Sequence, residues 1–319
     1  MPFGDFTPEL RFHVASYLDR SDALSLASAH PSWQDAAEAV LWREVKMPNV
    51  DVPDLWWTGG QLHKLDAFLR RCYIRLCDAI FSRPARATMI REFAFVLIND
   101  VAGLIVELAR RSLPGLRVIQ LSPICIDSEW NEDHQIHRIY EQLATLPPSP
   151  SLTRADLYLS GQWHAEIPIM LRLAPRLSYL RFDSDRWDST DLQPALWPTM
   201  PVLRTICAGN LTNITQGIID KLLVGTPEAR TILCQMGGDD EIDFRRIAEH
   251  SCLAHIQLSL DPEVTNAVLR RLSRALCDSS SKIASISAPF TASLPQPSCT
   301  TSTYSRTAFN PSFPPLISR

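Results

Sequence analysis

The sequence predicts an α/β protein in which three short N-terminal helices precede a solenoid with parallel strands. Apolar and tryptophan residues recur at helical spacing through residues 6–45. A short apolar motif then recurs from residue 93 onward at intervals close to 25 residues, with helix-like patterns between the copies. We therefore divide the chain into residues 1–46 (three helices), 47–88 (a loop and one helix), 89–288 (repeats) and 289–319 (a Pro/Ser/Thr-rich tail).

The first helix is predicted by one apolar face. Leu10, Val14, Tyr17 and Leu18 lie at positions i, i+4, i+7 and i+8, which fall on the same side of a helix. Pro8 suits the first turn of this helix, because a helix leaves the amide there without an internal partner.

Two further helices are indicated by their end signals. Ser21 is the expected N-cap of the second helix, and Pro31 ends it because the residue before a proline is biased away from helix. Ser32 and Asp35 are similar to a capping box that would open the third helix. Three helices this short bury little apolar surface, so we expect the segment to dock on a partner.

The order of these residues resembles an F-box over about one eighth of the chain. The matching residues are Phe6, Pro8-Glu9-Leu10, Tyr17-Leu18, Asp22-Ala23-Leu24, Trp33 and Leu41-Trp42-Arg43. Phe6 stands where the family has a leucine. The alternative interpretation is an ordinary three-helix cap on a larger domain.

The resemblance, to fungal-type F-box proteins with irregular repeats, implies a function without catalysis. F-boxes bind a Skp-type adaptor, which connects them to a cullin scaffold and a RING ubiquitin ligase. The chain would then be the substrate receptor of an SCF-type ligase. The residues that would form the helix core and the adaptor contact are Pro8, Leu10, Leu18, Leu24, Leu26, Trp33, Leu41 and Trp42.

The repeat motif has the form apolar-x-x-apolar-x-apolar. Its copies are Phe93-x-x-Val96-x-Ile98, Leu116-x-x-Ile119-x-Leu121, Leu152-x-x-Ala155-x-Leu157, Leu177-x-x-Leu180-x-Phe182, Leu203-x-x-Ile206-x-Ala208, Ala229-x-x-Ile232-x-Cys234, Leu253-x-x-Ile256-x-Leu258 and Ile283-x-x-Ile286-x-Ala288. Their starts are 23, 36, 25, 26, 26, 24 and 30 residues apart, which is similar to an irregular leucine-rich repeat with one strand and one helix per unit. The 36-residue interval predicts an insertion in a loop at 122–135. A non-repetitive α/β domain is the alternative.

The segments that flank the repeats have distinct patterns. Leu62, Leu65, Leu69, Cys72, Leu76 and Ile80 mark one long amphipathic helix, which we expect to cap the first repeat. The tail at 289–319 carries almost no charge, and we expect it to be disordered.

Composition argues against several classes of protein. A net charge of −4 gives no case for a nucleic-acid or membrane surface, and no apolar run approaches the roughly 20 residues of a membrane span. Without a signal peptide, the expected location is cytoplasmic or nuclear. The eight cysteines include no C-x-x-C pair, and His134 and His137 lack a second ligand pair, so we expect reduced thiols, no metal and no cofactor.

A target-binding surface was sought in the loops that follow the strands. Several of these loops are acidic or contain a tryptophan, and together they would suit a basic or hydrophobic segment of a target protein. The residues are Trp130, Trp163, Trp187, Asp183 and Asp239. The alternative is that the tryptophans plug repeat ends and the acids are solvent-exposed.

Two functional classes remain open from the sequence. The first is the substrate receptor of a cullin-based ubiquitin ligase. The second is a non-catalytic interaction scaffold that acts outside such a ligase. Neither class requires an active site, and the chain lacks a G-x-S-x-G, P-loop or G-x-G-x-x-G motif.

Overall fold

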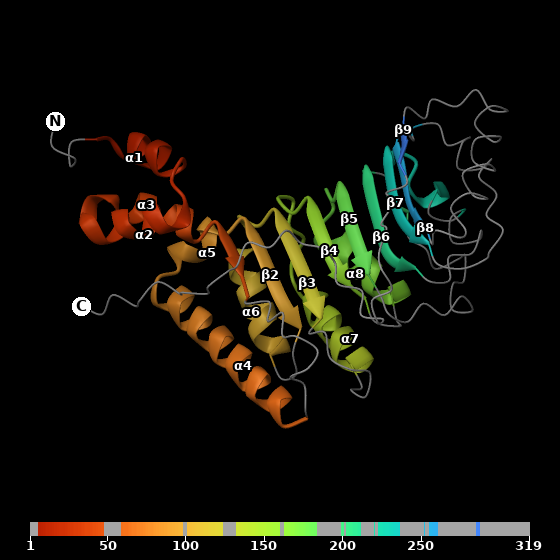
Figure 1. The fold of residues 1–319 in the computed structure, drawn as a ribbon, viewed down its shortest axis with the longest axis horizontal. Helices are drawn as coiled ribbons and strands as arrows, with labels where there is room; N and C mark the ends of the chain where they lie inside the picture. The colour runs from red at the N-terminus through yellow and green to blue at the C-terminus, as the bar shows by residue number, and fades with distance from the viewer. Residues whose placement is uncertain are drawn as a thin grey trace.

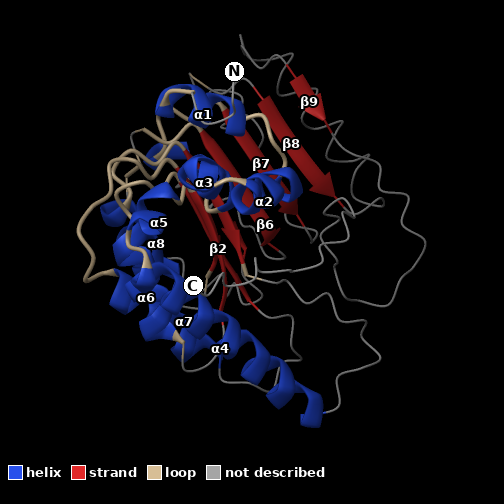
Figure 2. Ribbon diagram, turned by 90° about the vertical axis from the view of Figure 1, so that its left-hand side faces the viewer, coloured by secondary structure: helices blue, strands red, loops and turns tan. Residues whose placement is uncertain are grey.

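A computed structural model describes residues 6–47, 59–97, 101–123, 132–159, 163–183, 199–200, 202–211, 220, 223–236, 252, 255–260 and 285–287. In these residues nine parallel strands form one sheet in sequence order, β1 to β9. Helices cover one face of the sheet, and a three-helix unit lies at its N-terminal end (Figures 1 and 2). The predicted α/β architecture with parallel strands is therefore confirmed.

The strands repeat the same short pattern at each turn of the chain. They are β1 (Glu44–Lys46), β2 (Glu92–Leu97), β3 (Val118–Pro123), β4 (Arg154–Tyr158), β5 (Tyr179–Asp183), β6 (Thr205–Leu211), β7 (Thr231–Met236), β8 (His255–Leu260) and β9 (Ser285–Ser287). The middle apolar residues of the motif share one register position, held by Val45, Phe93, Ile119, Ala155, Leu180, Ile206, Ile232, Ile256 and Ile286.

Helices precede β1 and connect several of the strands that follow it. They are α1 (Pro8–Ala15), α2 (Arg20–Ala29), a 3-10 turn η2 (Pro31–Trp33), α3 (Gln34–Leu41), α4 (Gly59–Ser82), α5 (Ala85–Met89), α6 (Ala102–Ser112), α7 (Glu132–Leu143) and α8 (Trp163–Leu173). The predicted insertion at 122–135 is not all loop, because Glu132 already opens α7. None of the described helices combines the length and the apolar character that a membrane crossing requires.

The core lies between the sheet and the helices. Phe93 and Phe95 are fully buried with stacked rings whose centroids are 3.9 Å apart, and Ile105 of α6 is fully buried in the same cluster. Full burial of each such side chain contributes about 1.5–3 kcal/mol. In β4 buried and partly exposed residues alternate, so the repeat pattern there has the predicted cause, a strand with one buried face.

The first repeat lies in a different register from the one predicted. Phe93 pairs with Ile119 and Phe95 with Leu121, so the first described copy is Ile90-x-x-Phe93-x-Phe95 rather than Phe93-x-x-Val96-x-Ile98. Its start is then 26 residues before the next copy. The prediction was shifted by three residues because β2 also buries Val96 and Leu97, which makes several registers fit the apolar pattern.

Two predicted helix caps are wrong. The second helix begins at Arg20, where the Asp19 carboxylate accepts the Asp22 amide at 2.8 Å, so Ser21 lies inside the helix. The predicted capping box does not form either, because Pro31 opens a 3-10 turn in which His30 Nδ1 accepts the Ser32 amide. Pro8 does occupy the first turn of α1, and Thr7 caps this helix.

The long helix α4 contacts β2 at the point where the shorter β1 no longer pairs with it. Beyond the last residue pair of the short β1, the buried Tyr73 hydroxyl donates to the Val96 carbonyl at 2.7 Å and accepts the Val96 amide at 3.0 Å. Without Tyr73, the amide and the carbonyl of Val96 would face a position that β1 is too short to reach. Burial raises the pKa of Tyr73, so this hydroxyl stays protonated and able to donate.

Candidate functional site

The apolar face of α1 lies on the outside of the protein. Leu10, Val14 and Tyr17 are 41%, 39% and 76% exposed; Leu10 and Val14 lie one turn apart on α1, and Tyr17 lies in the turn after the helix ends at Ala15. The opposite side packs inward through the fully buried Ala15, and Arg11 Nη1 donates to the Ser32 carbonyl at 2.8 Å. We call Leu10, Val14 and Tyr17 the α1 stripe.

The structure separates the eight residues predicted for the adaptor contact into three groups. Pro8 and Leu10 are exposed on α1, whereas Trp33 and Leu41 are buried. The remaining residues are partly buried: Leu18, Leu24, Leu26 and Trp42. The two buried residues form the core of the three-helix unit, so only the other six can reach a partner without unfolding.

Trp33 shows how that core is built. It is 1% exposed at the end of η2, and the ring of Phe6 meets it edge-on with centroids 5.8 Å apart. Phe6 therefore adds an edge-to-face aromatic contact to the core around Trp33.

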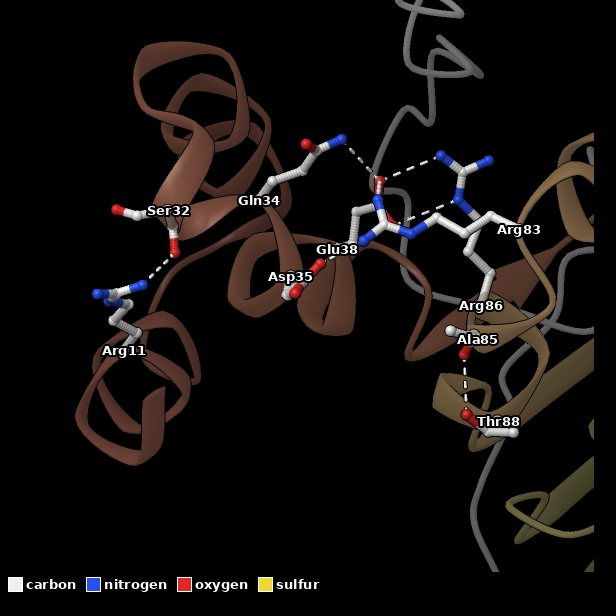
Figure 3. Close-up of polar contacts among 9 residues, drawn as sticks. All are labelled: Arg11, Ser32, Gln34, Asp35, Glu38, Arg83, Ala85, Arg86 and Thr88. Carbon is white, nitrogen blue, oxygen red and sulfur yellow. Dashed lines mark hydrogen bonds and ion pairs between the residues drawn. The ribbon is translucent and has the colours of Figure 1, made fainter. Parts of the chain in front are cut away.

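Ion pairs fix the three-helix unit to the solenoid (Figure 3). Glu38 of α3 is 5% exposed and accepts Arg83 Nη1 at 2.9 Å and Arg86 Nη2 at 3.1 Å. Asp35 also pairs with Arg83, and the Arg86 guanidinium lies over the Trp42 ring, 5.2 Å from its centroid. A buried carboxylate with two guanidinium partners holds its neighbours in a defined geometry.

The backbone adds a second connection. β1 begins three residues after α3 ends, and it pairs in parallel with β2 through Glu44, Val45 and Lys46. The expected boundary at residue 46 thus falls at the end of a strand that belongs to the sheet. A short strand and a set of ion pairs together attach the three-helix unit to the repeats.

Two of the five predicted target-binding residues lie in the described part of the chain. Trp163 is the first residue of α8, and Asp183 is the last residue of β5. Asp183 thus lies at the carboxyl end of its strand, and Trp163 lies after the carboxyl end of β4. Trp130, Trp187 and Asp239 lie outside the described residues.

Polar side chains that sequence reasoning missed cross the face of the sheet opposite the core. Gln120 Nε2 and Arg154 Nη2 both donate to Asp156 Oδ2 at 3.0 Å. Arg154 also lies over the Tyr179 ring, 4.3 Å from its centroid, and Cys207 Sγ donates to the Tyr179 hydroxyl at 3.3 Å. Burial raises the pKa of Cys207, so the thiol is protonated and acts as a donor. These side chains occupy the polar positions of the strand alternation, which is the signal that could have found them.

No arrangement for acid–base or metal chemistry emerges from the described side chains. In that part of the chain no three His, Cys, Asp or Glu residues gather as metal ligands would. The nearest to such a group is His137, whose Nδ1 lies 3.4 Å from Oε1 of the buried Glu166 and whose Nε2 lies 3.7 Å from Glu141. This contact joins α7 to α8.

Comparison with known proteins adds no relative. No protein-family model matches the chain, and no curated protein matches it.

Proposed function

We propose that the chain is the substrate receptor of an SCF-type ubiquitin ligase, with the α1 stripe as the contact for a Skp-type adaptor and the repeats as the surface for a target protein. The observation that carries the proposal is the exposure of Leu10 and Val14 on α1 and of Tyr17 just after it, on a segment that is anchored through Ala15 and Arg11. Contiguous exposed apolar side chains on a folded protein mark surfaces for partners. The F-box resemblance of the same helix supplies the kind of partner.

The attachment of the three-helix unit supports a bridging role. A receptor must hold its target at a fixed place relative to the ligase, because ubiquitin transfer requires the reacting groups to be close together. Glu38, its two arginines and β1 provide such a fixed connection. A scaffold that acts outside a cullin ligase is the second candidate, since it would use the same helix without the ligase.

Capture of purified proteins tests the proposal. Immobilised wild-type chain is mixed with a recombinant Skp-type adaptor and then with a cullin scaffold. Leu10→Ala/Tyr17→Ala is expected to lose most of the captured adaptor, because each truncation removes apolar area from the contact. The matched control is Phe68→Ala/Ile74→Ala, which removes two exposed apolar side chains on α4 and should capture the adaptor normally.

Each outcome decides between the candidates. Retention of adaptor and cullin by wild type and control, with loss in the α1 variant, supports the ligase receptor. Capture of adaptor without cullin favours the scaffold. Failure of the wild type to capture adaptor at micromolar concentration rules out both uses of the α1 stripe.

A further inference from the structure

Five arginines that are spread over almost 190 residues of the sequence lie in a row at the starts of the strands. Arg43, Arg91 and Arg117 directly precede β1, β2 and β3, and Arg204 and Arg230 directly precede β6 and β7. Thr153 and Ser178 hold the equivalent positions before β4 and β5. We call the five arginines the arginine row; it runs along the edge where the strands begin, the upper edge of the sheet in Figure 1.

Backbone hydrogen bonds hold these positions in register. The Arg91 amide donates to the Arg43 carbonyl at 2.9 Å, the Arg117 amide to Arg91 at 2.7 Å, and the Arg230 amide to Arg204 at 2.8 Å. Thr153 and Ser178 continue the same ladder between Arg117 and Arg204. Neighbouring strands lie about 4.8 Å apart, so the row is a regular line of cations rather than a chance cluster.

Most of the row is available to a ligand. Arg43, Arg117, Arg204 and Arg230 are exposed, and no other described side chain or backbone group bonds their guanidinium groups. Arg91 differs, since its guanidinium donates to the carbonyls of Thr88 and Gly115.

The negative charges near the row lie mainly at one end. Glu44 and Glu92 follow Arg43 and Arg91, and Glu44 is paired with Lys46. Farther along, Asp156 is occupied by Arg154, and Glu228 is the one exposed acid in the turn before β7. The stretch from β3 to β7 is therefore the basic part, although the whole chain carries a net charge of −4.

Exposed apolar side chains accompany this basic part. Val202, in the turn before β6, is 47% exposed, and Val224, before the turn to β7, is 82% exposed. The two turns are joined because the Met200 amide donates to the Gly225 carbonyl at 2.6 Å. Apolar groups beside cations suit a polypeptide with both acidic and apolar side chains, whereas a nucleic-acid backbone would gain nothing from the valines.

From this edge we infer a binding site for an acidic, extended segment of a target polypeptide. The carboxylates of this segment contact Arg117, Arg204 and Arg230. Its apolar side chains contact Val202 and Val224. The distance from β3 to β7 is about 19 Å, which about six residues of extended chain cover. Exposed guanidinium groups bind carboxylates in a bidentate way. The inference rests on the receptor function proposed above and names the chemistry of its target.

The test measures peptide binding to the isolated chain by fluorescence anisotropy. The probe is a fluorescein-labelled peptide of about ten residues in which Asp and Glu alternate with Val. Arg117→Gln/Arg204→Gln/Arg230→Gln should weaken binding about tenfold, since three exposed charge contacts are lost, and added salt should weaken wild-type binding in the same direction. The matched control Arg70→Gln/Arg71→Gln/Arg75→Gln removes three exposed arginines of α4 and should change affinity by less than about twofold.

Three results would overturn the inference: equal loss in both triple variants, equal binding of a peptide with Asn and Gln in place of the acids, or tighter binding of a single-stranded DNA of the same charge. Arg204→Glu alone provides a second variant in which the charge is reversed at one exposed position. Because the assay omits the adaptor, its outcome is independent of adaptor capture. Leu10→Ala/Tyr17→Ala should bind the acidic peptide normally, and the arginine-row variant should capture adaptor normally.

Discussion

The helices α1 and α6 both carry apolar residues at helical spacing, but they use them in opposite ways. In α6, Ile105 and Leu108 are fully buried against the sheet, whereas in α1, Leu10 and Val14 remain about 40% exposed. The contrast shows that an apolar stripe in the sequence indicates an interface without saying whether the interface lies within the chain or with another molecule. Substitutions of the buried residues should therefore mainly lower the stability of the protein. Substitutions of the exposed residues of α1 should mainly weaken the binding of a partner.

The largest effect should come from the core of the solenoid. Phe93→Ala removes a fully buried ring stacked on Phe95, so the free energy of unfolding should fall by about 3–5 kcal/mol. Leu10→Ala in the α1 stripe should lower it by less than about 1 kcal/mol, since the side chain is already largely in water. Urea denaturation of both variants measures the difference. Equal losses would show that α1 is part of the folding core rather than an exposed docking surface.

An intermediate effect is expected at the junction between the two regions. Glu38→Gln keeps the shape of the side chain but removes the charge that Arg83 and Arg86 contact, so the free energy of unfolding should fall by about 2 kcal/mol. Asp35→Asn is the matched control because Asp35 contacts the same Arg83 from a largely exposed position, and its loss should be below about 0.5 kcal/mol. Chemical denaturation measures the free energy of unfolding of both variants. A larger decrease in Asp35→Asn than in Glu38→Gln would contradict the prediction.

The smallest effect concerns alkaline pH. Burial on α4 raises the pKa of Cys77 from 9.0 to about 11. The unfolded chain therefore releases this proton first, and the free energy of unfolding should fall as pH rises from 9 to 11, with no contribution below pH 9. The fall should be steeper in wild type than in Cys77→Ala, as followed by denaturation at several pH values. Parallel pH profiles would mean that Cys77 is open to solvent.

The sequence was sufficient for most of the strand positions. Seven copies of the motif lie in register in the sheet, and in β4, where burial is described, buried and partly exposed residues alternate with a period of two. β2 was misread where that condition fails, since Val96 is buried as well. β1 was missed because three residues are too few for the period to show.

The candidate surfaces were harder to predict than the fold. The apolar positions of α1 were evident, but their exposure depends on the packing of Ala15 and Arg11 on the inner side. The arginine row could not be recognised from local sequence, because its members are brought together only by the register of strands that lie about 25 residues apart. Sequence reasoning placed the target at the carboxyl ends of the strands, whereas the arginine row lies where the strands begin.

The Tyr73 hydroxyl has a consequence for how molecules of this protein meet one another. An open edge of a parallel sheet offers free amides and carbonyls to any passing strand, and edge-to-edge pairing of this kind starts aggregation. At β2 the tyrosine occupies both groups of Val96, and α4 carries it there as part of the same chain. One side-chain oxygen thus keeps the part of β2 that β1 leaves unpaired from pairing with a strand of a second molecule.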